Sequence, residues 1–202
     1  MARGPSYNVP FRRRREGKTD YQLRQRLILS GLPRLVTRKT QKHIIVQLIK
    51  STAAGDEVLT SAHSIELRKK YGWLGDLSNI PAAYLTGLLC GYRSMVRGVK
   101  EAVLDIGLQS PSKGARVFAV LKGFIDAGVE VPHNEEVLPD ENRIAGKHIE
   151  EYAAKLSSDQ DSYSRMFSQY LSRGLSPQKI SENFSSVKEK IIIEFEKSAK
   201  TQ

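Results

Sequence analysis

Residues 34–62 read RLVTRKTQKHIIVQLIKSTAAGDEVLTSA and have the residue pattern of a β-sheet. Three apolar runs, at residues 34–38, 43–49 and 58–62, alternate with short polar linkers. Isoleucine, valine and threonine recur in the runs, as is typical of strands. Linkers this short connect neighbouring strands as hairpins. The stretch therefore predicts an antiparallel meander of three strands.

The spacing of apolar residues becomes helical on the C-terminal side of this meander. Residues 64–71 read as a short helix that Gly72 closes. Asn79 is placed to cap a longer helix that starts at Pro81 and keeps apolar residues at helical spacing as far as Met95. Both segments predict helices that follow the meander directly.

A second alternation of strand and helix follows. Residues 102–106 read as a buried strand, Ser112 opens a helix that runs to Gly128, and residues 129–131 form a short last strand. Helices that alternate with strands predict an α/β core with at least one parallel crossover.

Residues 139–202 are expected to form a helical extension with three apolar stripes. The stripes are Ile144, His148, Ile149, Tyr152 and Leu156; Tyr163, Met166, Phe167, Tyr170 and Leu171; and Ile180, Phe184, Val187, Ile191 and Phe195. Ser176 and Pro177 mark the start of the third helix. Because the segment is close to neutral and rich in aromatic residues, we expect it to make protein–protein contacts.

The net charge of the chain is +10, but it is unevenly distributed. Residues 1–50 hold thirteen lysines and arginines and two acidic residues, which gives +11. Residues 51–202 therefore carry −1. Such an asymmetry indicates a polyanionic partner for the N-terminal side of the chain.

Residues 1–18 combine four consecutive arginines with prolines, glycines and little to bury. We interpret them as an extended arm that a partner orders. Arginine forks match phosphate oxygens bidentately, and Tyr7, Phe11 and Tyr21 lie close enough in sequence to stack on unpaired bases. The arm is therefore the first candidate nucleic-acid site, with a merely solvated charge run or a localisation signal as the alternative.

A first helix follows the arm. Thr19 is placed as its N-cap, and Gln22 would complete a capping box. Gly31 and Pro33 end the helix. One apolar face is expected to consist of Leu23, Leu27 and Ile28.

Two further loops could contact a polyanion. Residues 38–43 lie between two strands and would present three cations, a hydroxyl and an amide from a rigid base. Residues 110–116 stand at a helix start, where free N–H groups favour a phosphate, although the spacing of a Walker motif is missing. A solvated turn and ordinary capping by Ser112 are the respective alternatives.

Patterns that would indicate catalysis are weak. Ser61, His63 and Ser64 lie close together, but no third group is evident to orient the base, and no G-x-S-x-G elbow occurs. Asp105 and Asp126 could pair, yet one ends a strand and the other lies late in a helix. We therefore expect a protein that is not an enzyme.

We also expect no cofactor, no metal and no membrane partner. Cys90 is the single cysteine and lies among leucines, which is typical of a packed thiol, and the four histidines have no metal-ligand spacing with it. The absence of an internal disulfide fits a reducing cytoplasm. No run approaches the roughly 18 apolar residues that cross a membrane.

Several stretches together resemble one family. Residues 10–21, PFRRRREGKTDY, look like the opening of archaeal large-subunit ribosomal protein eighteen, whose eukaryotic counterpart is large-subunit protein five. The resemblance continues through Arg38-Lys39-Thr40, Tyr71-Gly72-Trp73, PAAYLTG at residues 81–87, Asp105-Ile106-Gly107-Leu108, Pro132-His133 and Leu138-Pro139-Asp140. It spans most of residues 5–150 and is less sharp beyond them.

The resemblance implies a structural constituent of the large subunit that binds 5S rRNA. It implies that the protein anchors this RNA to 23S rRNA at the central protuberance, beside neighbouring large-subunit proteins of the cytoplasmic ribosome. The implied fold is a ribonuclease H-like mixed sheet with flanking helices, without the nuclease's carboxylate cluster. Such proteins turn their arm and first hairpin toward RNA.

The chain is accordingly divided into a basic arm with the first helix (1–33), an α/β RNA-binding core (34–138) and the helical extension (139–202). The candidate RNA-binding residues from the arm, the loops and the resemblance are Phe11, Arg12, Arg13, Arg14, Arg15, Lys18, Tyr21, Arg24, Arg38, Lys39, Thr40, Lys42, His43, Lys113 and Arg116. Two alternatives stay open. An RNA-processing enzyme on the same fold would need converging acidic metal ligands, and a DNA-compacting protein would bind without regard to RNA shape.

Overall fold

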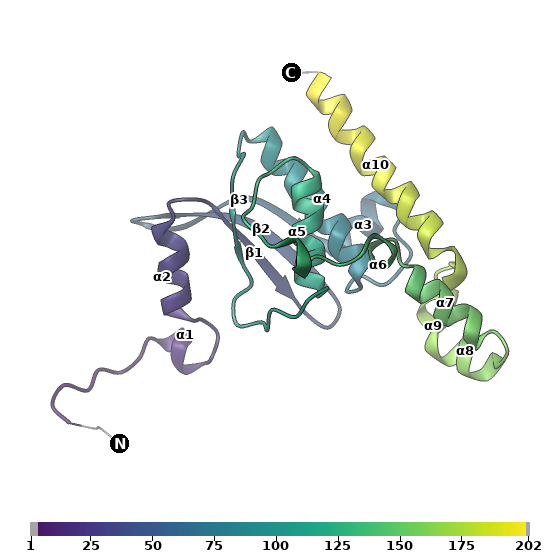
Figure 1. The fold of residues 1–202 in the computed structure, drawn as a ribbon, viewed down its shortest axis with the longest axis horizontal. Helices are drawn as coiled ribbons and strands as arrows, with labels where there is room; N and C mark the ends of the chain where they lie inside the picture. Colours follow the sequence, from purple (N-terminus) through teal and green to yellow (C-terminus); the bar gives the residue numbers. More distant parts are fainter. Residues whose placement is uncertain (1–3, 201–202) are drawn as a thin grey trace.

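The computed structural model describes residues 4–200, with side chains described as far as Lys197. A small sheet and two long helices form the centre, the basic N-terminal segment lies at one end, and a group of short helices lies at the other (Figure 1). Residues 1–3 of the predicted arm and 201–202 of the predicted extension lie outside the described residues.

The elements follow one another in the order drawn in Figure 1. The strands are β1 (Arg34–Lys39), β2 (Ile44–Thr52), β3 (Gly55–His63) and β4 (Val103–Asp105). The helices are α1 (Arg12–Arg15), α2 (Tyr21–Leu29), α3 (Ser64–Tyr71), α4 (Ile80–Val96), α5 (Arg116–Asp126), α6 (Glu141–Ala145), α7 (Lys147–Leu156), α8 (Gln160–Met166), α9 (Ser168–Ser172) and α10 (Ile180–Lys200). Two 3₁₀ turns, η1 (Glu135–Val137) and η2 (Pro177–Lys179), precede α6 and α10.

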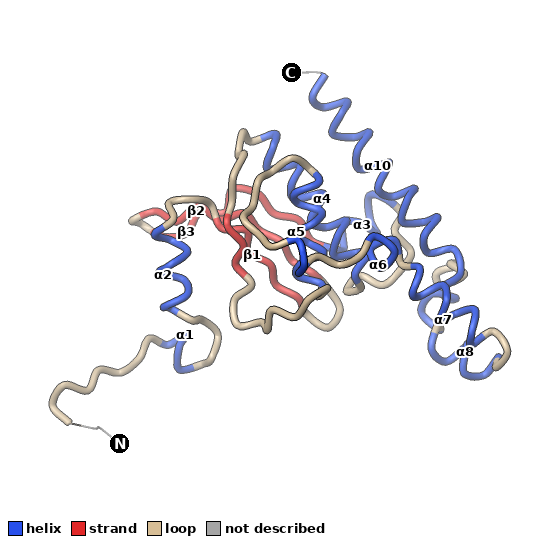
Figure 2. The backbone as a smooth tube through the Cα atoms, in the orientation of Figure 1, coloured by secondary structure: helices blue, strands red, loops and turns tan. Residues whose placement is uncertain are grey.

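The sheet has four strands in the order β3-β2-β1-β4. The pairs β1–β2 and β2–β3 are antiparallel, whereas β4 runs parallel to β1. Figure 2 shows the strands in red. The chain reaches β4 through α3 and α4, because a parallel neighbour cannot be joined by a tight hairpin. The predicted meander is confirmed, and so is the predicted fold class, a mixed α/β sheet with flanking helices.

One face of this sheet forms the core. Ile44, Val46 and Leu48 of β2 are fully buried, while the residues between them are partly exposed. This period of two follows from the alternation of side chains along a strand. The helices α4 and α5 pack against the buried face (Figure 1). The opposite face of the sheet is therefore the one available to the N-terminal segment.

The helices α4 and α5 approach each other at backbone distance. A Cβ atom on Gly87 would lie 2.1 Å from the carbonyl oxygen of Val120, and one on Gly123 would lie 2.2 Å from that of Tyr84. Real Cβ atoms do not come this close to other atoms. Only glycine therefore permits this packing.

The predicted boundaries of α3 and α4 are confirmed by their caps. The side chain of Asn79 accepts a hydrogen bond of 2.9 Å from the backbone N–H of Ala82, and proline occupies the first turn of α4. Gly72 ends α3 in the left-handed conformation, with φ of 77°. These local signals need no tertiary context, which explains why the sequence is sufficient to predict them.

The predicted start of the next helix is wrong. The helix α5 begins at Arg116 and not at Ser112. Residues before it form a turn in which the backbone N–H of Gly114 donates to the carbonyl oxygen of Val137, at 2.9 Å. This long-range hydrogen bond holds the segment outside the helix, and nothing local in the sequence indicates it.

The last predicted strand, residues 129–131, is reduced to a single bridge. Glu130 pairs in parallel with Glu101, just before β4, through hydrogen bonds of Glu130 to residues 100 and 102. Pro132 follows and has no N–H with which to extend a ladder. The fourth strand is likewise shorter than predicted, at three residues.

The edge strand β3 is covered by side chains from α4. Arg93 donates to the carbonyl oxygen of Ser61 at 2.6 Å, and Arg97 donates to that of Leu59. The carboxylate of Glu66 holds Arg93 in place at 2.6 Å. Two carbonyl groups of β3 are therefore occupied within the chain.

The C-terminal helices pack onto the same core. Ile180, Val187 and Ile191 of this region are fully buried and belong to one hydrophobic cluster with α4 and the sheet. The ring of Phe184 lies 5.7 Å from that of Tyr84. The extension is thus part of the packed core, in addition to whatever it contacts outside.

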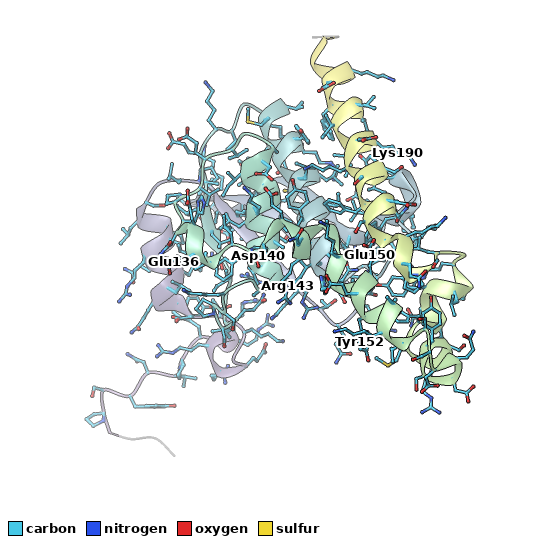
Figure 3. All side chains as sticks on the ribbon, turned by 45° about the vertical axis from the view of Figure 1, so that its right-hand side comes forward. Glu136, Asp140, Arg143, Glu150, Tyr152 and Lys190 are labelled. Carbon is cyan, nitrogen blue, oxygen red and sulfur yellow. The ribbon has the colours of Figure 1, made fainter. Side chains whose placement is uncertain are left out.

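Most aromatic side chains of the extension are used within the chain. Phe167 is buried, and its ring lies 6.2, 5.3 and 5.9 Å from those of Tyr152, Tyr163 and Tyr170. The surplus of aromatic surface inferred from the sequence is therefore smaller than expected. Tyr152 and Met166 stay exposed on the short helices that project from the body, where Figure 3 labels Tyr152.

Candidate nucleic-acid interface

The open face of the sheet lies across a groove from α1 and α2. Because alternate residues of a strand share a face, β1 places Arg34, Val36 and Arg38 there together. The groove has a volume of 420 Å³. Its charged lining residues are Arg13, Lys18, Arg24, Arg34 and Arg38 against Asp20, Asp56 and Asp105. Five cations and three carboxylates give the groove an excess of positive charge.

The helix α2 buries none of its residues. Leu23 and Leu27 line the groove, whereas Ile28 lines a separate hollow. The prediction that these three residues share one apolar face is therefore wrong. Ile28 lies on a different side of α2 from Leu23 and Leu27. A helix without a buried stripe is not held by the core, so other contacts must position it.

A chain of ion pairs ties α2 to the sheet. Arg24 of α2 lies 2.9 Å from Asp56, which also pairs with Arg34 at 2.8 Å. Arg34 in turn pairs with Asp105 at 2.9 Å, and Asp105 pairs with Arg38 at 3.1 Å. Four elements, α2, β3, β1 and β4, are thereby linked along one face.

The carboxylate of Asp56 is stabilised in its ionised form. Partial burial alone would raise its pKa, but the hydrogen bond from Ser51 and the charges of Arg34 and Arg24 outweigh burial and lower the pKa. The charged form favours both ion pairs over the pH range in which proteins are normally studied. Asp56 therefore acts as an anchor for α2.

Arg38, predicted to contact RNA, is partly engaged inside the protein. Its guanidinium also donates to the carbonyl oxygen of Asp105 at 2.9 Å, and Gly107 lies against it with a positive φ of 65°. A Cβ atom at Gly107 would lie 3.0 Å from the guanidinium carbon. The side chain keeps 44% of its surface exposed, on the wall of the groove.

The arm is not extended throughout, which corrects the prediction. Arg12–Arg15 form the single helical turn α1. The Nε of Arg13 donates to the hydroxyl of Thr19 at 2.8 Å, and the ring of Phe11 lies 5.0 Å from that of Tyr21. These contacts fold the arm back against α2.

The cations of the arm are exposed and only partly neutralised. Glu16 lies 2.9 Å from Lys18 and 3.7 Å from Arg12. Arg14 and Arg15 make no ion pair with any residue that the structure describes. The positive charge of the arm is therefore exposed to the surroundings and is not used to stabilise the fold.

The cap of α2 also differs from the prediction by one residue. The carboxylate of Asp20 accepts hydrogen bonds from the backbone N–H groups of Gln22 and Leu23, at 2.9 and 3.1 Å. The hydroxyl of Thr19, expected to be the cap, is engaged by Arg13. Thr19 and Asp20 could each cap α2. Because Arg13 binds the hydroxyl of Thr19, Asp20 is the residue that caps the helix.

The loop between β1 and β2 is a tight turn. The hydroxyl of Thr40 and the backbone of His43 exchange hydrogen bonds of 2.9 Å, so this hydroxyl is engaged within the turn although Thr40 is exposed. Lys39 and Lys42 are exposed and form no ion pair among the described residues. The ring of His43 lies 5.0 Å from that of His63. The two lysines are therefore the groups of this loop that are available to a partner.

The third candidate site does not form as predicted. Lys113 lies outside the helix and pairs with Glu136 at 2.9 Å. Arg116 donates to the carbonyl oxygen of Ser78 at 2.9 Å. The helix start that was expected to bind a phosphate is displaced by four residues, and its two cations have partners within the chain.

The residues that could suggest a nucleophile–base pair have structural roles. The Nδ1 of His63 accepts the backbone N–H of Ile65 at 3.1 Å, as the N-cap of α3. The buried Ser64 hydroxyl accepts the backbone N–H of Ile44 at 3.1 Å. Ser61 is exposed on β3. The three are therefore not arranged as a catalytic unit.

The remaining chemical groups are likewise dispersed. Asp126 accepts the hydroxyl of Tyr84 at 2.7 Å, far from the network of Asp105. Burial raises the pKa of the Cys90 thiol to about 11. Within residues 4–200, no three histidine, cysteine or acidic side chains gather as a metal site would require. None of the helices described has the length and apolar character of a membrane span.

The pairing of Asp56 and Asp105 with the predicted cations could not be read from the sequence. Asp56 lies 2.9 Å from Arg24 and Asp105 lies 3.1 Å from Arg38 because the fold brings the start of β3 to α2 and pairs β4 with β1. The sequence separation of 71 residues between Arg34 and Asp105 carries no local signal. The one signal in the sequence is that Asp105 is an acidic residue at the end of an otherwise apolar strand.

The chain matches the family model described as ribosomal large subunit proteins 60S L5 and 50S L18, over residues 5–100 and 96–134. This protein belongs to that family. The resemblance inferred from residues 10–21 and the stretches that follow is thereby confirmed. A member of the 60S L5 and 50S L18 family is a structural protein of the large subunit, located in the cytoplasmic ribosome. The match ends at residue 134, so it does not include the C-terminal extension.

Proposed function

We propose that this protein binds 5S rRNA within the large subunit and anchors it to 23S rRNA at the central protuberance. The observation that carries the proposal is the exposed cationic segment of α1 and α2. It buries no residue and contributes nothing to the core. Charge that the fold does not need is available to a polyanion, and phosphate groups supply most of the affinity in such complexes.

The groove beside this segment supports the same assignment. Arg13, Lys18 and Arg24 line one wall and Arg38 lines the other. The ion pairs with Asp56 and Asp105 fix the arginines before binding, which lowers the entropy lost on association. We assign phosphate contacts to these residues and to the rest of Arg12–Arg15.

Lys39 and Lys42 extend the proposed surface beyond the groove. Lys39 is the last residue of β1, the strand that carries Arg38, and Lys42 lies in the turn that follows. A loop on a rigid hairpin is a common position for specific contacts. Thr40 and His43 would act by shaping this turn, because their polar groups bond to each other. Lys113 and Arg116 have a weaker claim, since neither lines the groove and the helix start predicted to bind a phosphate there does not form.

A salt titration of 5S rRNA binding tests the proposal. Replacing Arg12, Arg13, Arg14 and Arg15 with alanine should weaken binding and reduce the slope of log K against log salt by about 3. The matched control replaces four exposed cations of the extension, Lys147, Lys155, Arg165 and Lys179, and should keep the wild-type slope. Equal slopes for the arm variant and the wild type would contradict the proposal.

Competition distinguishes rRNA recognition from general polyanion binding. Unlabelled 5S rRNA should displace the labelled RNA, whereas duplex DNA of equal phosphate concentration should displace it poorly. A DNA-compacting protein would show equal displacement by both. Incubation with magnesium should leave the 5S rRNA intact, because we assign the protein a structural role.

A further inference from the structure

The outward side of α2 carries an apolar hollow with an aromatic floor. Tyr21, Gln25 and Ile28 follow one another at helical spacing on this side, and Phe11 of the arm closes one end. The hollow has a volume of 310 Å³, and Arg24 and Leu29 complete its lining. It lies on a different side of α2 from Leu23 and Leu27, which line the groove, and Arg24 lines both the groove and the hollow.

The side chains that form the hollow are unusually exposed for their type. Phe11 is 70% exposed and Leu29 is 78% exposed. The core cannot account for them, since α2 has no buried residue. An exposed apolar surface of this kind, kept in a segment that the core does not need, indicates a binding site.

The geometry of the two rings favours a flat ligand. The rings of Phe11 and Tyr21 lie 5.0 Å apart at an angle of 42°, so Tyr21 supports Phe11 from one side. The opposite side of the Phe11 ring stays open to the surroundings. A supported ring loses little freedom on binding, which suits it to stacking against another π system.

The charge around the hollow favours a ligand attached to phosphate. None of the six lining residues is acidic. Arg24 is one of them, but its guanidinium pairs with Asp56 in the groove, so the positive charge near the hollow comes mainly from the turn before α2. The turn Arg12–Arg15 follows Phe11 directly in the chain. A peptide would have to be acidic to bind beside these arginines, whereas a nucleotide combines a π face with an anionic backbone.

We propose that this hollow binds one unpaired nucleobase of RNA, stacked on Phe11, while the neighbouring arginines hold the flanking phosphates. The proposal rests on the proposed RNA-binding function and names the ligand of a separate pocket within it. The amide of Gln25 and the hydroxyl of Tyr21 are neutral polar groups of lining residues, and both can donate to or accept from the edge of the base.

Three substitutions at Phe11 separate stacking from simple apolar contact. Phe11→Ala removes the ring, Phe11→Leu keeps an apolar side chain without a π face, and Phe11→Trp keeps a larger π face. Binding of purified 5S rRNA should weaken about 5- to 100-fold for the first two and be retained for the third. The salt slope should not change in any of them, because no cation is removed. Val9→Ala, an equally exposed site outside the hollow, is the control and should bind as the wild type does.

The Phe11→Trp variant also gives a direct signal. The single native tryptophan, Trp73, is fully buried, so the added fluorescence comes from the hollow. Stacking of a base on the new indole should quench this emission on addition of 5S rRNA. Emission that is unchanged when the RNA is bound, or wild-type affinity of Phe11→Leu, would overturn the proposal.

A protein occupant is the remaining outcome and would also overturn it. Phe11→Ala would then bind 5S rRNA normally but be lost from purified large subunits during washing. The proposed function is tested by a different variant. It fails if replacing Arg12–Arg15 with alanine leaves the slope of log K against log salt unchanged. A reduced slope in that variant, with normal binding by every Phe11 variant, would reject the nucleobase site alone.

Discussion

Arg34 and Asp105 form an ion pair of 2.9 Å whose side chains are only 5% and 7% exposed. The pair joins the two parallel strands β1 and β4 on the open face of the sheet. Asp105 also accepts the backbone N–H of Gly107 at 2.9 Å. Because both charges are removed from water, each depends on the other for its solvation.

Asp105→Ala should lower the free energy of unfolding by about 3–5 kcal/mol, because it leaves the Arg34 charge buried without this partner. Urea denaturation measures the change. The matched control is Glu136→Ala, which removes a pair of the same length to Lys113 with both side chains about 70% exposed. The control should cost about 0–1 kcal/mol. Similar losses in the two variants would show that the burial of the Arg34–Asp105 pair is energetically irrelevant.

Gly123→Ala should destabilise the fold by about 1–3 kcal/mol or more, although alanine favours a helix over glycine. The added methyl group would meet the backbone of α4, which cannot move aside as a side chain can. Thermal unfolding compares it with Ser185→Ala, an exposed position on α10 where the same residue should be neutral or slightly stabilising. A Gly123→Ala variant as stable as the wild type would contradict the close approach of α4 and α5.

The stability of the protein should decline as the pH falls below about 6.5, partly through His63. Burial and the charge of His43 lower the pKa of His63 in the folded state, against the opposing effect of Glu66. The unfolded chain then binds a proton more readily than the folded one, so the contribution is present above the unfolded pKa. It is lost as the pH falls through the lower folded pKa.

His63→Asn tests this pH dependence. Asparagine can accept the hydrogen bond that His63 accepts from Ile65 but does not titrate. The melting temperature of the variant should fall less steeply than that of the wild type between about pH 7.5 and pH 5.5. Some decline should remain, because burial and Arg143 also lower the pKa of His148. Identical slopes for variant and wild type would exclude His63 as the titrating group.

The extension should contribute to retention in the large subunit more than to RNA affinity. Tyr152 and Met166 are exposed on α7 and α8, at the opposite end of the molecule from the arm (Figure 1). Replacing both with alanine should leave 5S rRNA affinity unchanged and increase loss of the protein from washed subunits. Point substitutions are required, because truncation after Leu138 would remove Ile180, Val187 and Ile191 from the core. A variant that loses RNA affinity while its melting temperature is unchanged would reject this division between the segments.

Local patterns in the sequence were sufficient for the sheet and for several helix ends. The meander is predictable because it depends on local features. These are the alternation of inward and outward side chains in residues 43–49 and the short linkers of each hairpin. The caps by Asn79 and Gly72 act within one turn of helix. The start of α5 is not predictable in this way, because a hydrogen bond between Gly114 and Val137 decides it.

The candidate site could be predicted only in part for the same reason. The arm is recognisable because its charge is concentrated in adjacent residues. Its folded-back turn depends on the contact between Phe11 and Tyr21, ten residues apart, and the availability of Arg38 depends on Asp105 across the sheet. Composition locates the cations, whereas tertiary pairing determines which of them remain available to bind a partner.

The arginines over β3 have a consequence for the chain before it joins a ribosome. An open edge strand invites another copy to add its own strand, and this is a common beginning of self-association. Arg93 and Arg97 occupy the carbonyl groups of Ser61 and Leu59 that such a copy would need, and the other edge, β4, is only three residues long. Both edges of the sheet are therefore poorly suited to pairing with a strand of a second copy.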